Sequence, residues 1–264
     1  MKFIDQMGNL IVLDKTPKRI VSLVPSQTEL LYYLRVPPIA QTIFCIHPDQ
    51  DYKKANKIGG TKKLNIQKII DLKPDLIIGN KEENDEHQIL ELQKLFPVWM
   101  SDIYSLKDAY EMIVSLGRIL DEDEAAINLK LQIERSFSRL ITPNFNKTVL
   151  YLIWNNPYFG VAKNTFVDDL ISTLGFTNVL KEEDRYPELS DKKIQELNPD
   201  LVFLSSEPFP FKKEHQKKLE TLLPSSSVLF VDGESFSWYG NRLLDTPFYF
   251  ENLISDIRTH ESES

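Results

Sequence analysis

Short apolar runs alternate with amphipathic segments along most of the chain, and one such arrangement occurs twice. Residues 65–79 are NIQKIIDLKPDLIIG and residues 190–204 are SDKKIQELNPDLVFL. Each copy predicts a short helix that is capped by Asn65 or Ser190 and stopped by a proline. A continuous apolar run follows the proline, as expected for a strand that is buried on both faces. The repeat therefore predicts helix, stop and parallel strand, twice.

A matching segment opens each half of the chain. Residues 20–24 and 149–154 predict buried strands, and each is followed by a loop and a helix. The first helix is predicted to begin with a capping box of Ser26 and Glu29, and the second to be capped by Asn164 or Thr165. Strands and helices that alternate in this way indicate an α/β fold with two lobes, each built on a parallel central sheet flanked by helices.

Two helices are predicted between these halves, over residues 105–120 and 121–140. The second begins with four acidic residues, which suit a helix N-terminus, and its apolar stripe comprises Leu129, Ile133, Phe137 and Leu140. Twenty helical residues span about 30 Å, roughly the width of a small domain. We therefore predict an N-terminal lobe over residues 1–120, a connecting backbone helix over 121–142 and a C-terminal lobe over 143–264.

Composition and charge exclude several classes of protein. The 264 residues carry a formal net charge of -8 without a basic block, which argues against a nucleic-acid partner. Cys45 is the single cysteine, so no intrachain disulfide can form, and we expect it to be a core thiol rather than a reactive one. No run approaches about 18 apolar residues, so membrane insertion is not expected. Because Asp5 and Gln6 interrupt a secretory apolar region, the chain is expected to be cytoplasmic if Met1 is its native start, and periplasmic if a signal peptide has been removed.

Polar and aromatic side chains follow the carboxyl ends of the predicted strands. In open parallel sheets ligands bind beyond these ends, near helix N-termini. Rings beside polar groups suit a flat amphipathic ligand. The ligand-binding candidates of the first lobe are Ser26, Gln27, His47, Thr61, Lys62, Glu82, Glu83 and Asn84, and those of the second are Trp154, Tyr158, Phe159, Tyr186, Glu234, Phe236, Trp238, Tyr239 and Arg242.

Simpler interpretations of these residues remain open. Trp154, Trp238 and Tyr158 could instead pack between loops. Residues 81–85 could form a solvated charge run. His47 follows the apolar run 42–46, which predicts a buried strand, and it is either a solvated side chain or a metal ligand facing Glu82 and Glu83. The sequence has no metal-ligand spacing, phosphate loop or catalytic triad, so no catalytic or metal residue is assigned.

Three segments carry a family resemblance: PKRIVSLVPSQTELLYYL, GGTKKLNIQKIIDLKPDLIIG and YPELSDKKIQELNPDLVFL. They resemble the cobalamin-, haem- and siderophore-binding proteins of ABC importers, the helical backbone metal receptor group. The resemblance extends from about residue 18 to about residue 253 and implies two α/β lobes joined by one backbone helix, with the ligand in a cleft between the lobes. It implies a binding protein for a corrinoid, haem or ferric chelate, without a covalent cofactor. A cytoplasmic enzyme or a sensor acting on such a ligand is the alternative.

The resemblance also marks individual positions. It implies ligand-facing roles for Phe159, Tyr186, Glu234 and Phe236. Thr61 and Trp238 depart from the cobalamin-binding members, which have an indole and an arginine at these two positions. Cobalamin itself is therefore in doubt, whereas the class of ligand is not.

A second departure concerns the transporter. The carboxylates that members of this group present to a permease correspond here to Gln67 and Lys192, so Glu188, Asp191 or Glu196 would have to replace them. A permease is therefore expected as a partner only if other carboxylates dock to it. The expected small-molecule partner is a metal chelate, and the chain is expected to be a monomer.

Overall fold

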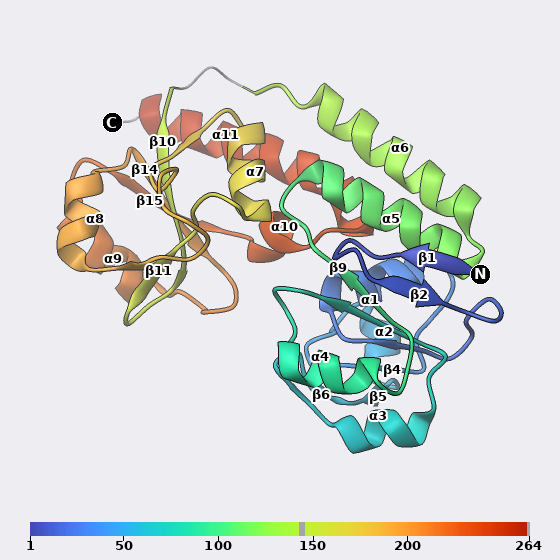
Figure 1. Cartoon of the computed structure of the whole chain (residues 1–264). Coiled ribbons are helices and arrows are strands. Elements are labelled where there is room, and N and C mark those ends of the chain that lie inside the picture. The colour runs from blue at the N-terminus through green and yellow to red at the C-terminus, as the bar shows by residue number, and fades with distance from the viewer. Residues whose placement is uncertain (143–145, 263–264) are drawn as a thin grey trace. The chain divides into compact units, whose positions relative to one another are not determined.

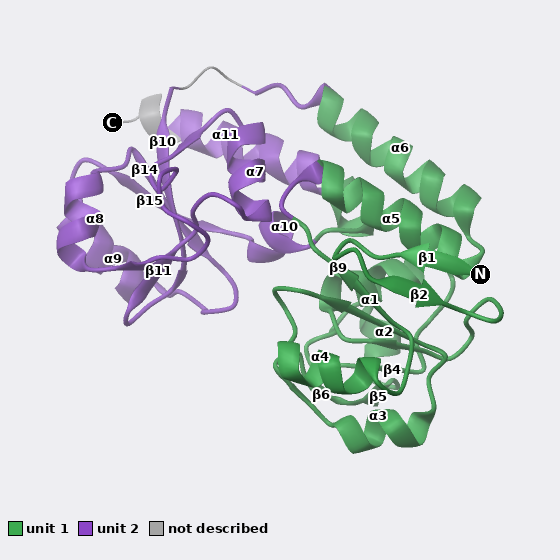
Figure 2. Ribbon diagram, in the orientation of Figure 1, with its two compact units in different colours: residues 1–103, 107–138, 239–244 green, residues 104–106, 139–238, 245–264 purple. Residues whose placement is uncertain are grey.

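The computed structural model describes residues 1–142 and 146–262, which form two compact units (Figures 1 and 2). Unit 1 contains residues 1–103, 107–138 and 239–244, and unit 2 contains residues 104–106, 139–238 and 245–264. The predicted backbone helix corresponds to α6 (Asp123–Arg139), most of which packs with unit 1. Its role as a link between lobes stays a prediction, as do the predicted lobe boundaries.

Unit 1 is built on a sheet of five parallel strands. The strand order is β5-β4-β3-β8-β9, and every neighbouring pair is parallel. All five residues of the interior strand β8 are buried, as the apolar run 76–78 predicts. The strands are β3 (Ile20–Ser22), β4 (Ala40–Gln41), β5 (Asn56–Lys57), β8 (Leu76–Asn80) and β9 (Val98–Ser101), with two antiparallel ribbons, β1 (Lys2–Ile4) with β2 (Leu10–Val12) and β6 (Gly59–Gly60) with β7 (Lys63–Leu64).

Helices accompany this sheet along the chain. The core of unit 1 joins Val21, Ile77 and Val98 of the strands to Ile69 and Leu92 of the helices. The helices are α1 (Pro25–Tyr33), α2 (Asp49–Tyr52), α3 (Ile66–Leu72), α4 (Glu86–Gln93), α5 (Leu106–Leu120), α6 and the short 3-10 helix η1 (Asn241–Leu244). Among the described residues, no helix combines the length and the apolar character that crossing a membrane requires.

Unit 2 has a mixed sheet with a parallel centre. Its order is β13-β11-β10-β14-β15, with β12 also paired to β10. The pairs β10–β14, β14–β15 and β10–β12 are parallel, whereas β11 is antiparallel to both β10 and β13. The strands are β10 (Thr148–Trp154), β11 (Tyr158–Gly160), β12 (Thr177–Asn178), β13 (Glu188–Leu189), β14 (Leu201–Ser205) and β15 (Ser227–Val231).

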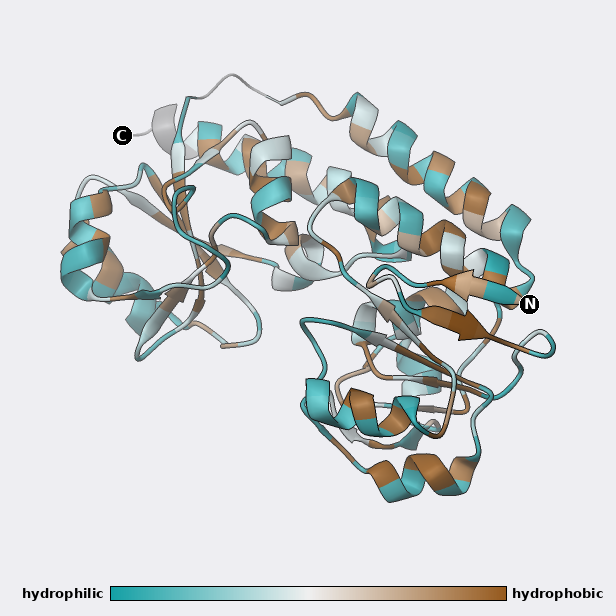
Figure 3. Ribbon diagram, in the orientation of Figure 1, coloured by the Kyte–Doolittle hydropathy of each residue, from teal (hydrophilic) through white to brown (hydrophobic). Residues whose placement is uncertain are grey.

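The central strands of unit 2 are mainly hydrophobic, whereas α8 and α9 alternate hydrophobic and hydrophilic residues (Figure 3). Leu150, Val202 and Val228 of the sheet pack with Ile194 of α8 and Leu219 of α9. The helices of unit 2 are α7 (Phe166–Thr173), α8 (Asp191–Leu197), α9 (Lys213–Leu222), α10 (Gly233–Ser237) and α11 (Thr246–Ser262). The two-lobed α/β fold with parallel central sheets is therefore confirmed.

The repeated Pro-Asp dipeptide ties the amino ends of neighbouring strands together. The Asp75 carboxylate accepts hydrogen bonds from the backbone N–H groups of Lys18 and Arg19, at 2.9 and 2.8 Å, just before β3. The Asp200 carboxylate accepts from the N–H and the hydroxyl of Thr148, at 2.7 and 2.6 Å, at the start of β10. The repeated Pro-Asp segment therefore has the same structural role in each sheet, which is to bind the start of the neighbouring strand.

Most of the predicted helix ends are confirmed. The side chains of Asn65, Thr165 and Ser190 accept hydrogen bonds from backbone N–H groups in the first turns of α3, α7 and α8. The capping box of Ser26 and Glu29 is wrong, because the N-cap of α1 is Val24, two residues earlier, and the helix has no side-chain cap. Proline suits the first helical position, where its missing N–H would have no partner in the helix.

Candidate functional site

In each unit the predicted ligand-binding residues follow the carboxyl ends of the parallel strands. Parallel strands end at the same side of a sheet, so the loops that follow them lie together. We call residues 23–28, 42–48, 59–64 and 81–85 the carboxyl edge of unit 1. Residues 154–159, 205–211 and 232–238 form the carboxyl edge of unit 2.

A hydrogen-bonded loop after β8 assembles the largest predicted group. The side-chain oxygen of Asn80 accepts from the N–H groups of Glu82 and Glu83, at 2.8 and 3.0 Å. The Lys62 ammonium donates to the carbonyl oxygens of Glu82 and Asn84. The Asn84 amide donates to the carbonyl oxygen of Thr61 at 3.1 Å. The structure therefore brings five predicted residues together: Thr61, Lys62, Glu82, Glu83 and Asn84.

Phe44 is a surface residue of this edge that the sequence analysis missed. The apolar run 42–46 is a loop rather than the predicted buried strand, since β4 ends at Gln41. Ile43, Phe44 and Ile46 are 52, 54 and 40% exposed. A Cβ on Gly60 would lie only 3.0 Å from the Phe44 ring, so the ring packs directly on the β6–β7 ribbon. The sequence signal that could have identified Phe44 as a surface residue is its position shortly before His47, in the loop that follows the end of β4.

The remaining predicted residues of unit 1 differ in exposure, and Thr61 and Asn84 of the loop described above are buried, at 9 and 4% exposure. Ser26 is 5% exposed, and Gln27 is fully buried, where its amide donates to the Ser101 hydroxyl. The His47 side chain is 26% exposed and lies 4.0 Å from the Asp49 carboxylate. Cys45 is buried as expected, and burial raises the pKa of its thiol.

The carboxyl edge of unit 2 presents an exposed aromatic surface. Trp154 and Phe159 are paired in the register of β10 and β11, so they are cross-strand neighbours. Trp154 is 41% exposed, and its ring lies 5.6 Å from that of Phe209. Tyr158 is 3% exposed and, as the residue before Phe159 in β11, points to the other face of the sheet.

Two predicted aromatic residues lie inside unit 2. Phe236 is fully buried, with its ring 5.1 Å from Tyr151 and 4.9 Å from Phe250. Trp238 is 6% exposed, and its indole N–H donates to the Glu207 carboxylate at 2.9 Å. These two rings therefore contribute to the interior of the unit rather than to its exposed surface.

Glu207 is a further polar residue of this edge. It follows β14 and accepts hydrogen bonds from the Ser237 hydroxyl and the Trp238 indole, at 2.8 and 2.9 Å. Burial raises the pKa of the Glu207 carboxyl, and the nearby Glu234 and Asp232 raise it further, against the effect of the two donors. Tyr186 and Glu234 are half-buried.

The last predicted loop, residues 232–242, is divided between the units. Residues up to Trp238 pack in unit 2, whereas Tyr239–Leu244 pack in unit 1. Tyr239 is 7% exposed, and the Arg242 guanidinium forms two hydrogen bonds to the Glu29 carboxylate of α1. Nothing in the sequence pattern indicates that this aromatic-rich loop is divided between two units.

The two positions that the family resemblance links to permease docking are both exposed. Gln67 donates to the Asp71 carboxylate at 2.8 Å in α3, and Lys192 lies 3.7 Å from Glu196 in α8. Within the described part of the chain, no three His, Cys, Asp or Glu side chains gather as a metal site would require. What both edges offer a ligand is exposed apolar and aromatic area beside hydrogen-bonding groups.

Comparisons with known proteins identify relatives over most of the chain. A family model described as "Periplasmic binding protein" matches residues 20–224. The uncharacterized ABC transporter substrate-binding lipoprotein YvrC of Bacillus subtilis is 25% identical over 213 residues, which cover 75% of this chain and 67% of that protein. The vitamin B12-binding protein of Vibrio vulnificus (strain CMCP6) is 27% identical over 197 residues, 71% of each chain.

Solved structures share the fold. The siderophore-binding protein BauB, bound to a complex of two acinetobactin molecules and ferric iron, matches with a TM-score of 0.76 at 20% identity, over 95% of this chain and 98% of BauB. Periplasmic haem-binding proteins match with TM-scores of 0.69, 0.74 and 0.76. At such identities the likeness shows a common fold.

Proposed function

Because the chain belongs to the periplasmic binding protein family, we propose that it is the substrate-binding component of an ABC importer whose ligand is a metal chelate. The class of ligand follows from the relatives and structural neighbours, which are named for vitamin B12, haem and a ferric siderophore. They are named as binding proteins, which supports binding rather than catalysis as the function of this chain.

One observation in the structure carries the proposal: large apolar rings are exposed at the carboxyl edges. Phe44 is 54% exposed in unit 1 and Trp154 is 41% exposed in unit 2. Phe44 belongs to an edge that also carries polar side chains, such as Lys62 and Glu83, and Trp154 is the last residue of β10, next to Asn155. A large amphipathic chelate gains burial from the rings and orientation from the polar groups.

Docking to a permease belongs to the same proposal. It would rely on carboxylates other than positions 67 and 192, because a neutral and a positive side chain occupy these. The acids beside these positions are Asp71, which accepts a hydrogen bond from Gln67 in α3, and Asp191 and Glu196 in α8.

Titration with three chelates tests the ligand class. Cyanocobalamin, haemin and a ferric siderophore should be added separately to the purified chain, with binding followed by absorbance and calorimetry. We expect one of them to bind. Phe44→Ala and Trp154→Ala should each weaken that binding about tenfold, since each removes a ring from the contact surface.

Phe248→Ala is the matched control. Phe248 lies in α11, is 69% exposed and is outside both carboxyl edges, so its loss should leave chelate affinity unchanged. If none of the three chelates binds, or if both edge variants bind as tightly as the wild type, the proposal fails.

A further inference from the structure

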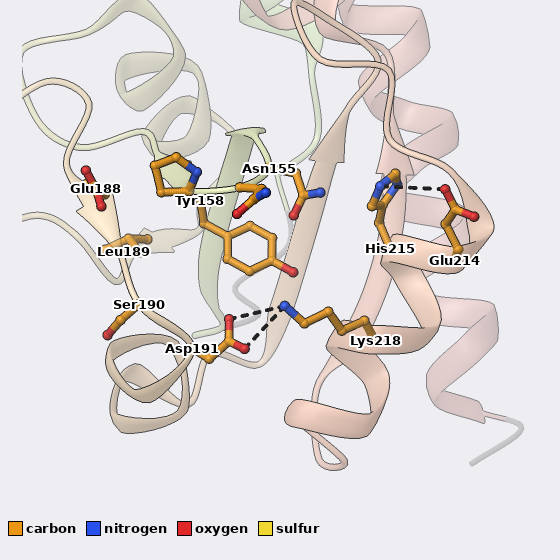
Figure 4. Close-up of a pocket in the computed structure, with 11 residues that line it drawn as sticks. Asn155, Tyr158, Glu188, Leu189, Ser190, Asp191, Glu214, His215 and Lys218 are labelled. Carbon is orange, nitrogen blue, oxygen red and sulfur yellow. Dashed lines mark hydrogen bonds and ion pairs between the residues drawn. The ribbon is translucent and has the colours of Figure 1, made fainter.

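Unit 2 contains a pocket of about 570 Å³ that Tyr158 of β11 and Lys218 of α9 line (Figure 4). The turn between β10 and β11, the start of α8 and the first turns of α9 form its walls. Tyr158 is the one predicted ligand-binding residue that lines it. Tyr158 and Phe159 point to opposite faces of β11, and the pocket lies on the Tyr158 side.

A buried hydroxyl group in this pocket lacks a well-aligned hydrogen bond. Tyr158 is 3% exposed, and its hydroxyl has no hydrogen-bond partner of ordinary geometry. The Lys218 ammonium lies 5.0 Å from the centre of the ring, and a hydrogen-bonding contact with the Tyr158 hydroxyl helps the Asp191 carboxylate to raise the pKa of Lys218. A buried hydroxyl whose one polar contact has poor geometry is unfavourable, so a ligand group that bonds to it gains a better-aligned hydrogen bond.

Two side-chain amides border the same space. Asn155 and Asn156, in the turn after β10, make no side-chain hydrogen bond to another described residue. Each amide offers both a donor and an acceptor, as does the Tyr158 hydroxyl. The pocket therefore offers a ligand neutral groups that can both donate and accept hydrogen bonds.

The charged groups around the pocket are largely occupied with one another. The Lys218 ammonium lies 3.2 Å from the Asp191 carboxylate. His215 accepts a hydrogen bond from the Lys212 N–H at its Nδ1, so its ring is neutral, and its Nε2 lies 3.9 Å from the Glu214 carboxylate. Glu188 is at the rim, and its carboxylate points away from Tyr158 in Figure 4. A charged ligand would have to break the Lys218 pair or remain without a full counter-charge.

We propose that this pocket is a second binding site and that it takes an uncharged polyhydroxylated molecule of about monosaccharide size. Neighbouring hydroxyl groups both donate and accept, which matches the phenol and the two amides. The paired Lys218 and Asp191 supply one more donor and one more acceptor at no net charge. The volume lies in the range of small-molecule pockets.

A panel of neutral and charged sugars tests this site with the full chain. Ligand-observed NMR should be recorded with glucose, galactose, mannose, ribose and myo-inositol, and with glucose 6-phosphate and glucosamine as charged analogues. We expect at least one neutral member to bind, and charged analogues to bind at least tenfold more weakly. Tyr158→Phe and Asn155→Ala should each weaken the neutral ligand about fivefold to tenfold.

Tyr151→Phe is the matched control. Tyr151 is a buried tyrosine of the same sheet, and its hydroxyl donates a hydrogen bond to Ser205. Tyr151→Phe removes a hydroxyl that does not line the pocket, so sugar binding should be unchanged. The inference is overturned if no neutral sugar binds, if a charged analogue binds more tightly, or if Tyr158→Phe binds as the wild type does. Since the panel contains no metal chelate, the result is independent of the proposed function.

Discussion

Trp238 shows that a single tertiary contact can distinguish a core aromatic residue from a ligand-binding one. The sequence places it in an aromatic-rich loop beside a strand end, which suggests a ligand contact. In the structure it is 6% exposed and donates a hydrogen bond to Glu207. Phe44 shows the reverse, because it belongs to an apolar run and is yet 54% exposed.

Trp238→Ala should therefore lower stability rather than affinity. Deleting a buried ring of this size costs about 3–5 kcal/mol of unfolding free energy, because the packing around the indole is lost. Trp238→Phe keeps a ring and removes the N–H donor, so it should cost less than Trp238→Ala. Urea unfolding followed by circular dichroism measures both changes.

The exposed Phe248→Ala serves as control and should shift the unfolding free energy by no more than about 0.5 kcal/mol. If Trp238→Ala leaves stability unchanged and weakens chelate binding at least tenfold, the prediction is wrong and Trp238 contacts the ligand.

At the scale of elements, the two aspartates of the Pro-Asp repeats join strand to strand. Asp200 is an acceptor for both donors of Thr148, and Asp75 does the same for two backbone N–H groups. Burial opposes ionisation of Asp200, but the hydrogen bonds from Thr148 outweigh it and hold the pKa of this carboxyl below its ordinary value.

Asp200→Asn should destabilise the chain by about 1–2 kcal/mol near neutral pH, since one charged acceptor of two hydrogen bonds is replaced by a weaker one. The sign of the pH dependence follows from the lowered pKa. The ionised carboxylate stabilises the folded state above its unfolded pKa, and this contribution is lost as the pH falls through the folded value.

The difference between wild type and Asp200→Asn should therefore shrink below about pH 4. Unfolding free energies measured from pH 3 to pH 7 check this. Glu220→Gln, an exposed acid in α9, should show no such trend. An Asn variant whose stability parallels the wild type at every pH would contradict the role given to Asp200.

At the scale of the whole molecule, the chain passes between the two units more than once. Residues 104–106 belong to unit 2, and residues 239–244 return to unit 1 before α11. The returning segment is held by Leu243, which is fully buried, and by the pair of Arg242 with Glu29. Neither unit is therefore one continuous stretch of sequence.

Arg242→Met should loosen this segment. The Arg242 guanidinium makes hydrogen bonds of 3.0 and 3.1 Å to Glu29, and both side chains are mostly buried, at 23% and 17% exposure. Leaving Glu29 without its partner should lower the unfolding free energy by about 1–3 kcal/mol. Hydrogen exchange of residues 239–244 should accelerate.

The double variant Glu29→Gln with Arg242→Met is the control, and it should be less destabilised than the sum of the two single changes because it leaves no unpaired charge. Additive effects, or unchanged exchange in residues 239–244, would argue against a linking role for the pair.

The sequence by itself determined the local elements and the fold class. Caps at Asn65, Thr165 and Ser190, and the buried strands after each Pro-Asp, depend on residues a few positions apart, so their pattern could be interpreted directly. The likeness of the two halves and the family resemblance rested on the same local patterns. The sequence also placed the candidate site at strand ends, because parallel topology decides where these ends meet.

Only the tertiary structure decided which side chains at those ends face solvent. Phe236 is buried by Tyr151 and Phe250, and Trp238 is held by Glu207, so their fates depend on residues 14 to 85 positions away. Exposure of Phe44 and the unsatisfied hydroxyl of Tyr158 likewise depend on packing between distant segments. Burial is a property of the assembled core, and hydrophobic pattern along a short segment cannot specify which distant residues will cover it.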